Sequence, residues 1–369
     1  MKRQFWFGML LAVVVLLAAC GPAATPTTEP SPTAAPSPTA EAESGRTLTV
    51  MTHSSFDASE EVIEAFKEQC NCEVRFLLEG DTGLMLNKAL LSKDVPLADV
   101  IYGVDNTFLS RALEGDILEA YQSPALADIP DDLELDATFR MLPVDYGDVC
   151  LNYDKGWFAG HELAPPDDLP ALTQPQYKSL AVVESPATSS PGLAFLLATI
   201  GRFGEEGDYT YLDYWADLRA NDVLVTEGWE DAYWGAFTYA SDGDRPIVVS
   251  YASSPPVEVY FADKPFEEAP TGVAAADGSC FRQVEFVGIL KGTPNRDLAE
   301  QWVDFMLSPT FQEDIPLKMF VFPANEKAAL PEVFARFAVI PANPVRLDPA
   351  EIEARREEWI QAWVRTVLR

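Results

Sequence analysis

Residues 47–102 read TLTVMTHSSFDASEEVIEAFKEQCNCEVRFLLEGDTGLMLNKALLSKDVPLADVIY, and this stretch decides the fold class. Leu48, Val50 and Thr52 alternate, which predicts a strand; Asp57 and Glu60, three positions apart, form a capping pattern before an amphipathic helix. The elements predicted next are strands at 74–78 and 98–102 and helices at 84–91 and 107–113. This alternation predicts an α/β fold with a mostly parallel sheet and helices on its faces.

A second unit is predicted to begin near Asp145. Its elements are strands at 149–151, 246–251 and 284–290 and helices at 193–200 and 297–307. Asp348, Pro349 and Glu351 supply the cap, first-turn proline and third-position carboxylate of a last helix. The folded part, from Arg46 to Arg369, is too long for one ordinary domain. We therefore predict two lobes, formed by 46–145 plus 284–369 and by 146–283.

The first residues carry the pattern of an exported protein. Lys2 and Arg3 precede an apolar run, which ends in the small residues before Cys20. This pattern predicts a signal peptide at 1–19 and a lipid on Cys20. Residues 20–45, rich in Pro, Thr and Ala, predict a disordered linker. We therefore expect an extracytoplasmic protein that is anchored to the cell membrane through its lipid.

Composition and motifs exclude several classes of function. The formal net charge of −32 argues against nucleic acid and anionic lipid as partners. The chain contains no Gly-x-Ser-x-Gly string, no P-loop and no dinucleotide fingerprint. Its two histidines, His53 and His161, form no zinc pattern with cysteine. We expect no catalytic residue, no cofactor and no metal, although an extracytoplasmic hydrolase is the rival to a solute-binding protein.

Aromatic residues stand beside short polar ones in several predicted loops. Trp229 follows a glycine, Tyr251 precedes Ala252, Ser253 and Ser254, and Ser189 with Ser190 opens a helix. Flat rings with a few polar donors suit a planar, cationic or heteroaromatic ligand. The same residues are also typical of an ordinary helix cap and a packed tryptophan.

The order and spacing of many short strings give the chain a resemblance to a known family. The strings are CNCE at 70–73, ADV at 98–100, DYG at 145–147, NYDK at 152–155, TSSPGL at 188–193, GWEDAY at 228–233, SYASSP at 250–255 and FMLSPTFQ at 305–312. The chain resembles the thiamine-binding proteins of bacterial ABC transporters. The resemblance implies a two-lobe type II periplasmic-binding-protein fold with a ligand cleft between the lobes.

The resemblance also implies a ligand, partners and a site. The ligand would be thiamine, thiamine phosphate, thiamine diphosphate or a related pyrimidine or thiazolium, which a monomer delivers to the permease. The implied binding residues are Asp81, Thr82, Ser189, Ser190, Trp229, Tyr251, Ala252, Ser253 and Ser254, with His53, Asp145, Tyr146 and Phe320 as further candidates. The rings would stack on the ligand, the hydroxyls and helix N–H groups would bind its hydroxyethyl or phosphate end, and Asp81 would favour its cation or exocyclic amine.

Three positions depart from the family pattern. His53 replaces a tyrosine, Val257 replaces an aromatic residue and Phe320 replaces a tryptophan. A base–aromatic stack is worth about 1–3 kcal/mol. These changes would weaken binding or shift the preference among thiamine-related ligands.

The cysteines after Cys20 leave the disulfide pairing open. Cys70 and Cys72 belong to the family pattern, and a bond between them would need a turn at Asn71. Cys150 and Cys280 lie outside the pattern and could form a bridge of their own. Alternatively, Cys150 would be the nucleophile of a thiaminase-like enzyme. An iron-binding transporter protein is a further alternative, but it would favour adjacent tyrosines, which the chain lacks.

Overall fold

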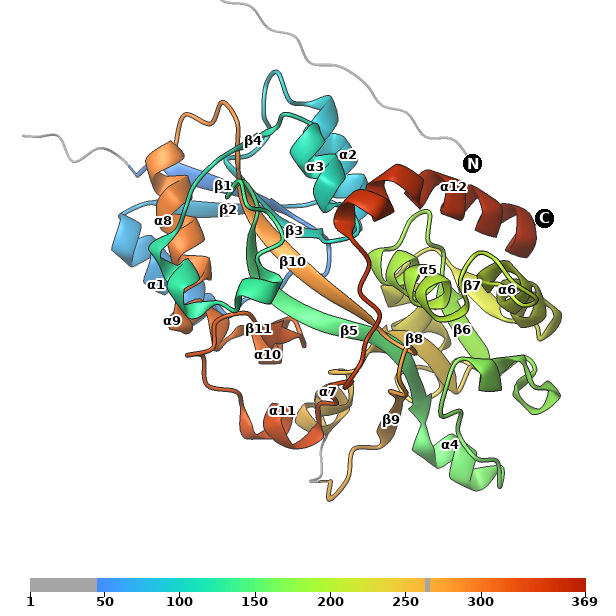
Figure 1. Cartoon of the computed structure of the whole chain (residues 1–369). Helices are drawn as coiled ribbons and strands as arrows, with labels where there is room; N and C mark the ends of the chain where they lie inside the picture. The colour runs from blue at the N-terminus through green and yellow to red at the C-terminus, as the bar shows by residue number, and fades with distance from the viewer. Residues whose placement is uncertain (1–44, 263–265) are drawn as a thin grey trace, which may run out of the picture. The chain divides into compact units, whose positions relative to one another are not determined.

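The strands form one mixed sheet with two long strands, β5 and β10, at its centre (Figure 1). The computed structural model describes residues 45–262 and 266–369, and within them the main strand order is β2-β1-β3-β10-β5-β8-β6-β7. The short strand β4 pairs with β10, and β9 and β11 pair with β5. The bounds are β1 Thr47–Thr52, β2 Glu73–Leu78, β3 Val100–Asp105, β4 Leu118–Glu119, β5 Leu142–Asp154, β6 Ala181–Glu184, β7 Leu224–Thr226, β8 Ile247–Tyr251, β9 Thr271–Ala274, β10 Phe281–Leu290 and β11 Phe322–Pro323.

The mostly parallel sheet that the strand-helix alternation of residues 47–113 predicts is confirmed for β1, β2 and β3, and parallel pairing recurs at the other end of the sheet. β1 pairs in parallel with β2 and β3, and β6 pairs in parallel with β7 and β8. Between these groups, β10 runs antiparallel to both β3 and β5, and β5 runs antiparallel to β8. The two long strands therefore join two parallel βα units into one sheet.

β5 is much longer than the strand predicted at 149–151. It runs for 13 residues and is buried along almost its whole length, so its sequence shows no alternation of apolar and polar residues. Pro143 and Gly147 lie inside it and conceal the strand further, because both residues usually mark turns. The strand predicted at 284–290 likewise begins earlier, at Phe281.

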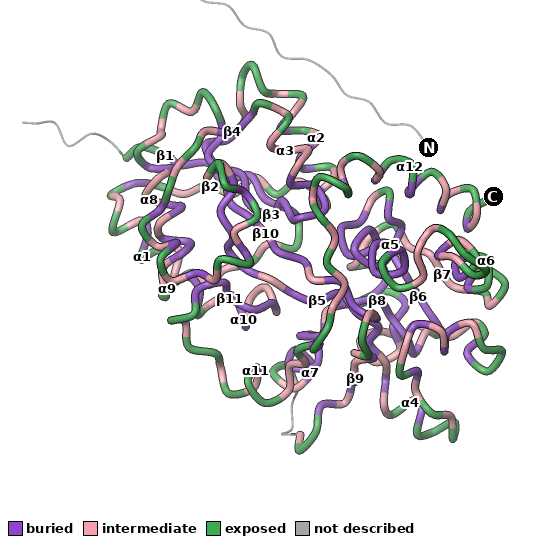
Figure 2. The backbone as a smooth tube through the Cα atoms, in the orientation of Figure 1, coloured by how far each residue is buried: buried purple, intermediate pink, exposed green. Residues whose placement is uncertain are grey.

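Helices cover the sheet and bury its apolar side chains (Figure 2). Near β1 and β2, for example, Phe66 of α1 packs edge-on against Trp302 of α8, with ring centroids 4.8 Å apart. The bounds are α1 Glu60–Cys70, α2 Thr82–Leu91, α3 Leu109–Glu114, α4 Lys155–Gly160, α5 Ser190–Phe203, α6 Tyr211–Ala220, α7 Pro255–Tyr260, α8 Arg296–Met306, α9 Pro309–Gln312, α10 Ile315–Lys318, α11 Glu332–Phe337 and α12 Pro349–Val367.

Two helix starts test the capping patterns of the sequence. The prediction that Asp57 caps α1 is wrong, because the cap position is Ser59, whose backbone N–H and hydroxyl both donate to Asp314 at 2.7 Å. The prediction for α12 is confirmed: Asp348 accepts a hydrogen bond from the Ala350 N–H at 2.8 Å, and Pro349 is the first helical residue. Local caps are predictable from sequence, whereas the cap of α1 depends on a residue far away in the chain.

The last helix contacts elements near both ends of the sheet. Trp363 of α12 packs edge-on against Trp215 of α6, with ring centroids 5.5 Å apart. Arg356, about two turns earlier, donates to the Thr107 carbonyl at 3.1 Å, just before α3. The helix therefore bridges elements that the sequence assigned to different lobes.

Several predictions lie outside these observations. The proposed signal peptide at 1–19, Cys20 and the linker up to Ser44 lie outside the described residues, and the lobe boundaries stay a prediction.

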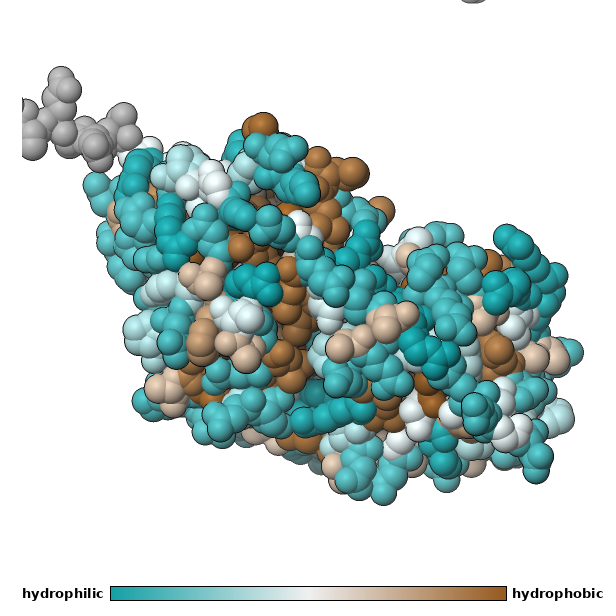
Figure 3. Space-filling model, turned by 45° about the horizontal axis from the view of Figure 1, so that its top comes forward, coloured by the Kyte–Doolittle hydropathy of each residue, from teal (hydrophilic) through white to brown (hydrophobic). Residues whose placement is uncertain are grey.

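Among the described helices, none has the length and apolarity needed to cross a bilayer. Hydrophilic residues predominate on the face shown in Figure 3, as expected from the net charge of −32.

Candidate functional site

A cavity of about 530 Å³ collects residues from both parallel groups of the sheet. His53 follows β1, Asp81 and Thr82 follow β2, Trp229 follows β7, and Tyr251 ends β8. In α/β sheets, ligands bind beyond the carboxyl ends of strands, where the connections diverge. The volume lies in the range of small-molecule sites.

The aromatic part of the cavity is held rigidly. The Trp229 indole donates to the Ser250 hydroxyl at 2.9 Å, and one of its faces stacks on Tyr233, with ring centroids 4.9 Å apart. Tyr251 lies against Gly147 so closely that a Cβ there would come within 2.7 Å of its ring. These fixed rings provide flat surfaces that need little ordering when a ligand binds.

A buried chain of hydrogen bonds connects Tyr251 to the start of α5. The Tyr251 hydroxyl donates to Gln283 at 2.9 Å, Gln283 donates to the Ser190 hydroxyl at 2.7 Å, and that hydroxyl donates to Asp105. Burial raises the pKa of Asp105 to about 6. The Ser190 hydroxyl therefore already has a donor and an acceptor, but it lines the cavity and keeps one lone pair, so its contact with a ligand stays a prediction.

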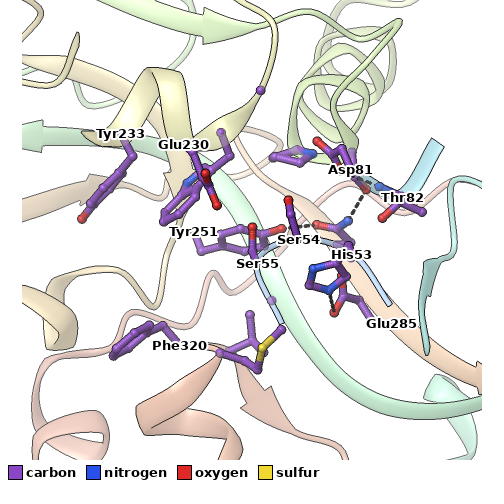
Figure 4. A pocket seen from close by; sticks show the side chains of 18 of the residues that line it. His53, Ser54, Ser55, Asp81, Thr82, Glu230, Tyr233, Tyr251, Glu285 and Phe320 are labelled. Carbon is purple, nitrogen blue, oxygen red and sulfur yellow. Dashed lines mark hydrogen bonds and ion pairs between the residues drawn. The ribbon is translucent and has the colours of Figure 1, made fainter. Parts of the chain in front are cut away.

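His53 forms an ion pair with Glu285 on one wall of the cavity (Figure 4). The imidazole Nε2 lies 3.6 Å from the carboxylate, and Nε2 is buried without a hydrogen-bond partner. Burial lowers the pKa of His53, but attraction to Glu285, Asp81 and Asp105 outweighs it and leaves the pKa above 6.5. Gly103, at φ +92°, permits this placement, because a Cβ there would collide with the imidazole.

Asp81 and Thr82 form the start of α2. Asp81 accepts from the Thr82 N–H at 2.8 Å, and the Thr82 hydroxyl donates to the Gly103 carbonyl at 2.9 Å. Burial raises the pKa of Asp81, opposed by hydrogen bonds from Thr82, Ser190 and Ser189 and by attraction to His53. Asp81 therefore lies between the starts of α2 and α5.

The structure brings most of the predicted site residues to the cavity. Those that line it are His53, Asp81, Thr82, Ser190, Trp229, Tyr251, Ser254 and Phe320. Val257, the position of a missing aromatic residue, also lines it.

Three predicted residues at the same loops do not line the cavity. Ser189 is the cap of α5 and accepts from the Gly192 N–H at 3.5 Å. The Ser253 hydroxyl donates to the Phe320 carbonyl at 2.6 Å, and Ala252 packs beside Cys150 and Cys280. Neighbouring residues of a loop point in different directions, so only some of them reach the cavity. These three pack behind its wall instead.

Two further predicted site residues, from the string DYG at 145–147 in β5, do not line the cavity. Asp145 accepts a hydrogen bond from the Tyr102 hydroxyl and is fully buried. Tyr146 stacks on Phe322, with ring centroids 5.4 Å apart, and holds Arg282 over its ring at 4.8 Å. Both therefore belong to the packing around β5.

The sequence reasoning missed several lining residues. Gln283 and Glu285 lie inside β10, where polar residues in a strand give no local signal of a site. Glu230 and Tyr233 belong to the matched string GWEDAY, which could have identified them. In Figure 4, Glu230, Tyr233 and Phe320 lie across the cavity from His53 and Glu285.

The alternative roles of the cysteines are resolved by the disulfides. Cys70 is bonded to Cys72, and Asn71 between them adopts a left-handed conformation at φ 49°. Cys150 is bonded to Cys280, both are fully buried, and neither lines the cavity. The hypothesis that Cys150 is an enzymatic nucleophile is therefore wrong, because its sulfur is neither a free thiol nor exposed to a ligand.

For the iron-binding alternative, the described residues contain no group of three or more His, Cys, Asp and Glu side chains that could hold a metal ion.

Comparison with known proteins identifies the family. Residues 95–342 match the model of the bacterial extracellular solute-binding protein family. The chain is 32% identical to the thiamine-binding periplasmic protein of Salmonella typhimurium and 31% identical to that of Escherichia coli, covering 87% of this chain and 94% of each relative. A solved periplasmic thiamin binding protein superposes with a TM-score of 0.77 at 29% identity, covering 88% of this chain and 97% of that one. The chain thus has the two-lobe α/β fold of periplasmic binding proteins and belongs to the family of bacterial extracellular solute-binding proteins.

Proposed function

We propose that this protein captures thiamine, or a thiamine phosphate or related pyrimidine or thiazolium compound, and delivers it unchanged to the permease of an ABC transporter. The observation that carries the proposal is one cavity that combines the ring faces of Trp229 and Tyr251 with the carboxylates of Asp81 and Glu285. Aromatic faces attract a thiazolium cation, and carboxylates accept hydrogen bonds from an exocyclic amine. The names of the relatives support the same ligand.

The experiment that tests the proposal is calorimetric titration of the purified protein with thiamine, its mono- and diphosphate, and the free aminopyrimidine. We expect micromolar or tighter binding of at least one thiamine compound. Trp229→Ala should weaken that binding by about 5- to 150-fold, because a base–aromatic stack is worth about 1–3 kcal/mol.

Trp157→Ala is the matched control, because Trp157 lies on α4 and does not line the cavity. This variant should bind like the wild type. If none of the four compounds produces heat, the proposed ligand class is wrong.

We also propose that residues 1–19 are removed as a signal peptide and that a lipid on Cys20 anchors a monomer on the extracytoplasmic side of the membrane. The small residues before Cys20 and the proline-rich segment after it support this arrangement. A multi-chain lipid anchors firmly, because each buried methylene contributes about 0.8 kcal/mol.

Metabolic labelling with a radioactive fatty acid tests the lipid anchor. The wild type should incorporate label and fractionate with membranes, whereas Cys20→Ala should do neither. Label retained by Cys20→Ala would contradict the assignment of Cys20.

A further inference from the structure

The Trp229 ring, one of the flat surfaces of the cavity, belongs to a segment with little support of its own. It comes shortly before the π-helical turn η5 (Asp231–Ala236), and π-helical turns are rare and short in proteins. Glu230 and Trp234 in this segment are exposed, whereas Tyr233 is buried. The position of Trp229 must therefore depend mainly on contacts that reach the segment from other parts of the fold.

A chain of hydrogen bonds holds the edge of this ring. The Trp229 indole donates to the Ser250 hydroxyl at 2.9 Å, and that hydroxyl lies 2.9 Å from the Ser254 hydroxyl. Ser254 in turn forms a hydrogen bond with the Tyr233 hydroxyl, which donates to Glu258. Because the indole N–H can only donate and the carboxyl oxygen at the other end accepts, each hydroxyl between them has both a donor and an acceptor.

The same chain also supports the face of the ring. Tyr233 stacks on Trp229, with ring centroids 4.9 Å apart and an angle of 21° between the ring planes. The Tyr233 hydroxyl is fixed by Glu258, so the edge contact and the face contact of Trp229 lead to the same acceptor. In a buried chain of this kind the hydrogen bonds strengthen one another, and loss of one member weakens the rest.

Glu258 is placed to support this chain rather than to contact a ligand. It is 7% exposed and does not line the cavity, whereas Val257, the residue before it in α7, does. Its second oxygen accepts from the Thr271 hydroxyl of β9 at 3.2 Å, so both oxygens of the carboxyl group are engaged. The acceptor at the end of the chain is therefore itself held in place.

We propose that Glu258 is a positioning residue of the cavity: through Tyr233, it holds the Trp229 ring in the orientation that the ligand meets. The effect on affinity rests on the proposed function, because thiamine is the probe. A side chain that must first be ordered when the ligand binds lowers affinity by about 2- to 10-fold. Loss of the contact with Glu258 should weaken binding by this factor, although the ring itself is still present.

Two single variants and their combination test the contact by calorimetry of the full-length protein with thiamine. Tyr233→Phe keeps the stacked ring but removes its hydroxyl, and Glu258→Ala removes the acceptor but keeps the tyrosine. Each should raise the Kd by about 2- to 10-fold. The double variant should bind about as well as the weaker single variant, because both substitutions break the same contact.

Glu258→Gln is the conservative variant that should restore most of the affinity. Its amide keeps an oxygen that accepts from Tyr233, and its NH₂ group can donate to the Thr271 hydroxyl.

Tyr214→Phe is the matched control for loss of a buried tyrosine hydroxyl. Tyr214 is fully buried, donates to the Leu169 carbonyl at 3.0 Å and does not line the cavity. This variant should bind thiamine like the wild type, even if its stability falls.

A second measurement follows the Trp229 ring without any ligand. In protein labelled with 5-fluorotryptophan, the fluorine resonance of this ring is the one that disappears in Trp229→Ala. It should be single and sharp in the wild type, Glu258→Gln and Tyr214→Phe. In Tyr233→Phe and Glu258→Ala it should broaden or split, because the ring samples more than one orientation.

The outcomes separate this inference from the proposed function. If the wild type binds thiamine, then full affinity in a folded Tyr233→Phe or Glu258→Ala variant overturns the positioning role, as do additive losses in the double variant. If Glu258→Ala does not fold, Tyr233→Phe tests the same contact alone. If the wild type binds no thiamine compound, the proposed function is refuted, and the fluorine resonance decides the positioning role: an unchanged resonance in Tyr233→Phe overturns it.

Discussion

Glu258 is a buried carboxyl group directly behind the aromatic wall of the cavity. It accepts hydrogen bonds from Tyr233, which stacks on Trp229, and from Thr271 at 3.2 Å. Burial raises its pKa to about 7, above the ordinary 4.5. The folded protein therefore binds this proton more tightly than the unfolded chain, and the resulting stability is fully present below about pH 4.5 and lost as pH rises through about 7.

Glu258→Gln tests this pH dependence. Each pKa unit corresponds to 1.36 kcal/mol, so the wild type should lose about 3 kcal/mol more unfolding free energy than the variant between about pH 4.5 and about pH 8. Urea denaturation at several pH values measures the difference. Equal pH dependence in wild type and variant would contradict the raised pKa, and the exposed Glu68→Gln should behave like the wild type.

Whether a cavity residue can be identified from the sequence depends on where it stands in its strand or helix. Asp81, Ser190, Trp229 and Tyr251 stand at the ends of strands or the starts of helices, where short polar and aromatic residues give a local signal. Glu285 gives no such signal, because a carboxylate inside β10 looks like any of the 58 acidic residues of the chain. The place of Glu285 in the cavity becomes visible only in the structure, where it pairs with His53.

At the level of elements, α12 is the helix whose start the sequence predicted most completely. The Asp348 side chain accepts from the Ala350 N–H, and Ile352, Trp359 and Trp363 are buried on one face. A cap residue replaced by alanine costs about 1 kcal/mol. Asp348→Ala should therefore lower the unfolding free energy by about this amount, measured by urea denaturation.

Asp348→Asn is the matched control for the cap. Asparagine keeps the side-chain oxygen that accepts from the helix start, so this variant should lose little stability. If alanine and asparagine destabilise the protein equally, the cap hydrogen bond is not the cause.

The sequence predicts the βα units at both ends of the sheet better than its centre. β1, β2, α5 and α12 lie close to their predicted ranges, because each has its own pattern of apolar residues and cap. β5 and β10 pair with each other across more than a hundred intervening residues, and their antiparallel direction follows from that distant pairing. No local pattern encodes a register of this kind, so the antiparallel pairing at the centre could not be predicted from the sequence.

For the molecule as a whole, the two disulfides should contribute very differently to stability. Cys150 and Cys280 are 130 residues apart in sequence, whereas Cys70 and Cys72 are two apart. A crosslink stabilises mainly by restricting the unfolded chain, and more so for a longer loop.

Removal of each pair by alanine tests this difference. The variant Cys150→Ala with Cys280→Ala should lose about 2–5 kcal/mol of unfolding free energy, measured with urea. The variant Cys70→Ala with Cys72→Ala should lose less and serves as the control. A larger loss in the Cys70 and Cys72 variant would contradict the entropic account.

The contacts of α12 with α6 and with the residues before α3 have a mechanical consequence. The helix has 19 residues, so its length is about 29 Å, and a helix of this kind changes its length very little. α6 and the residues before α3 are thus both held against one rigid helix. Because the helix hardly changes its length, any rearrangement that moves α6 relative to the residues before α3 must either keep both contacts with α12 or break one of them.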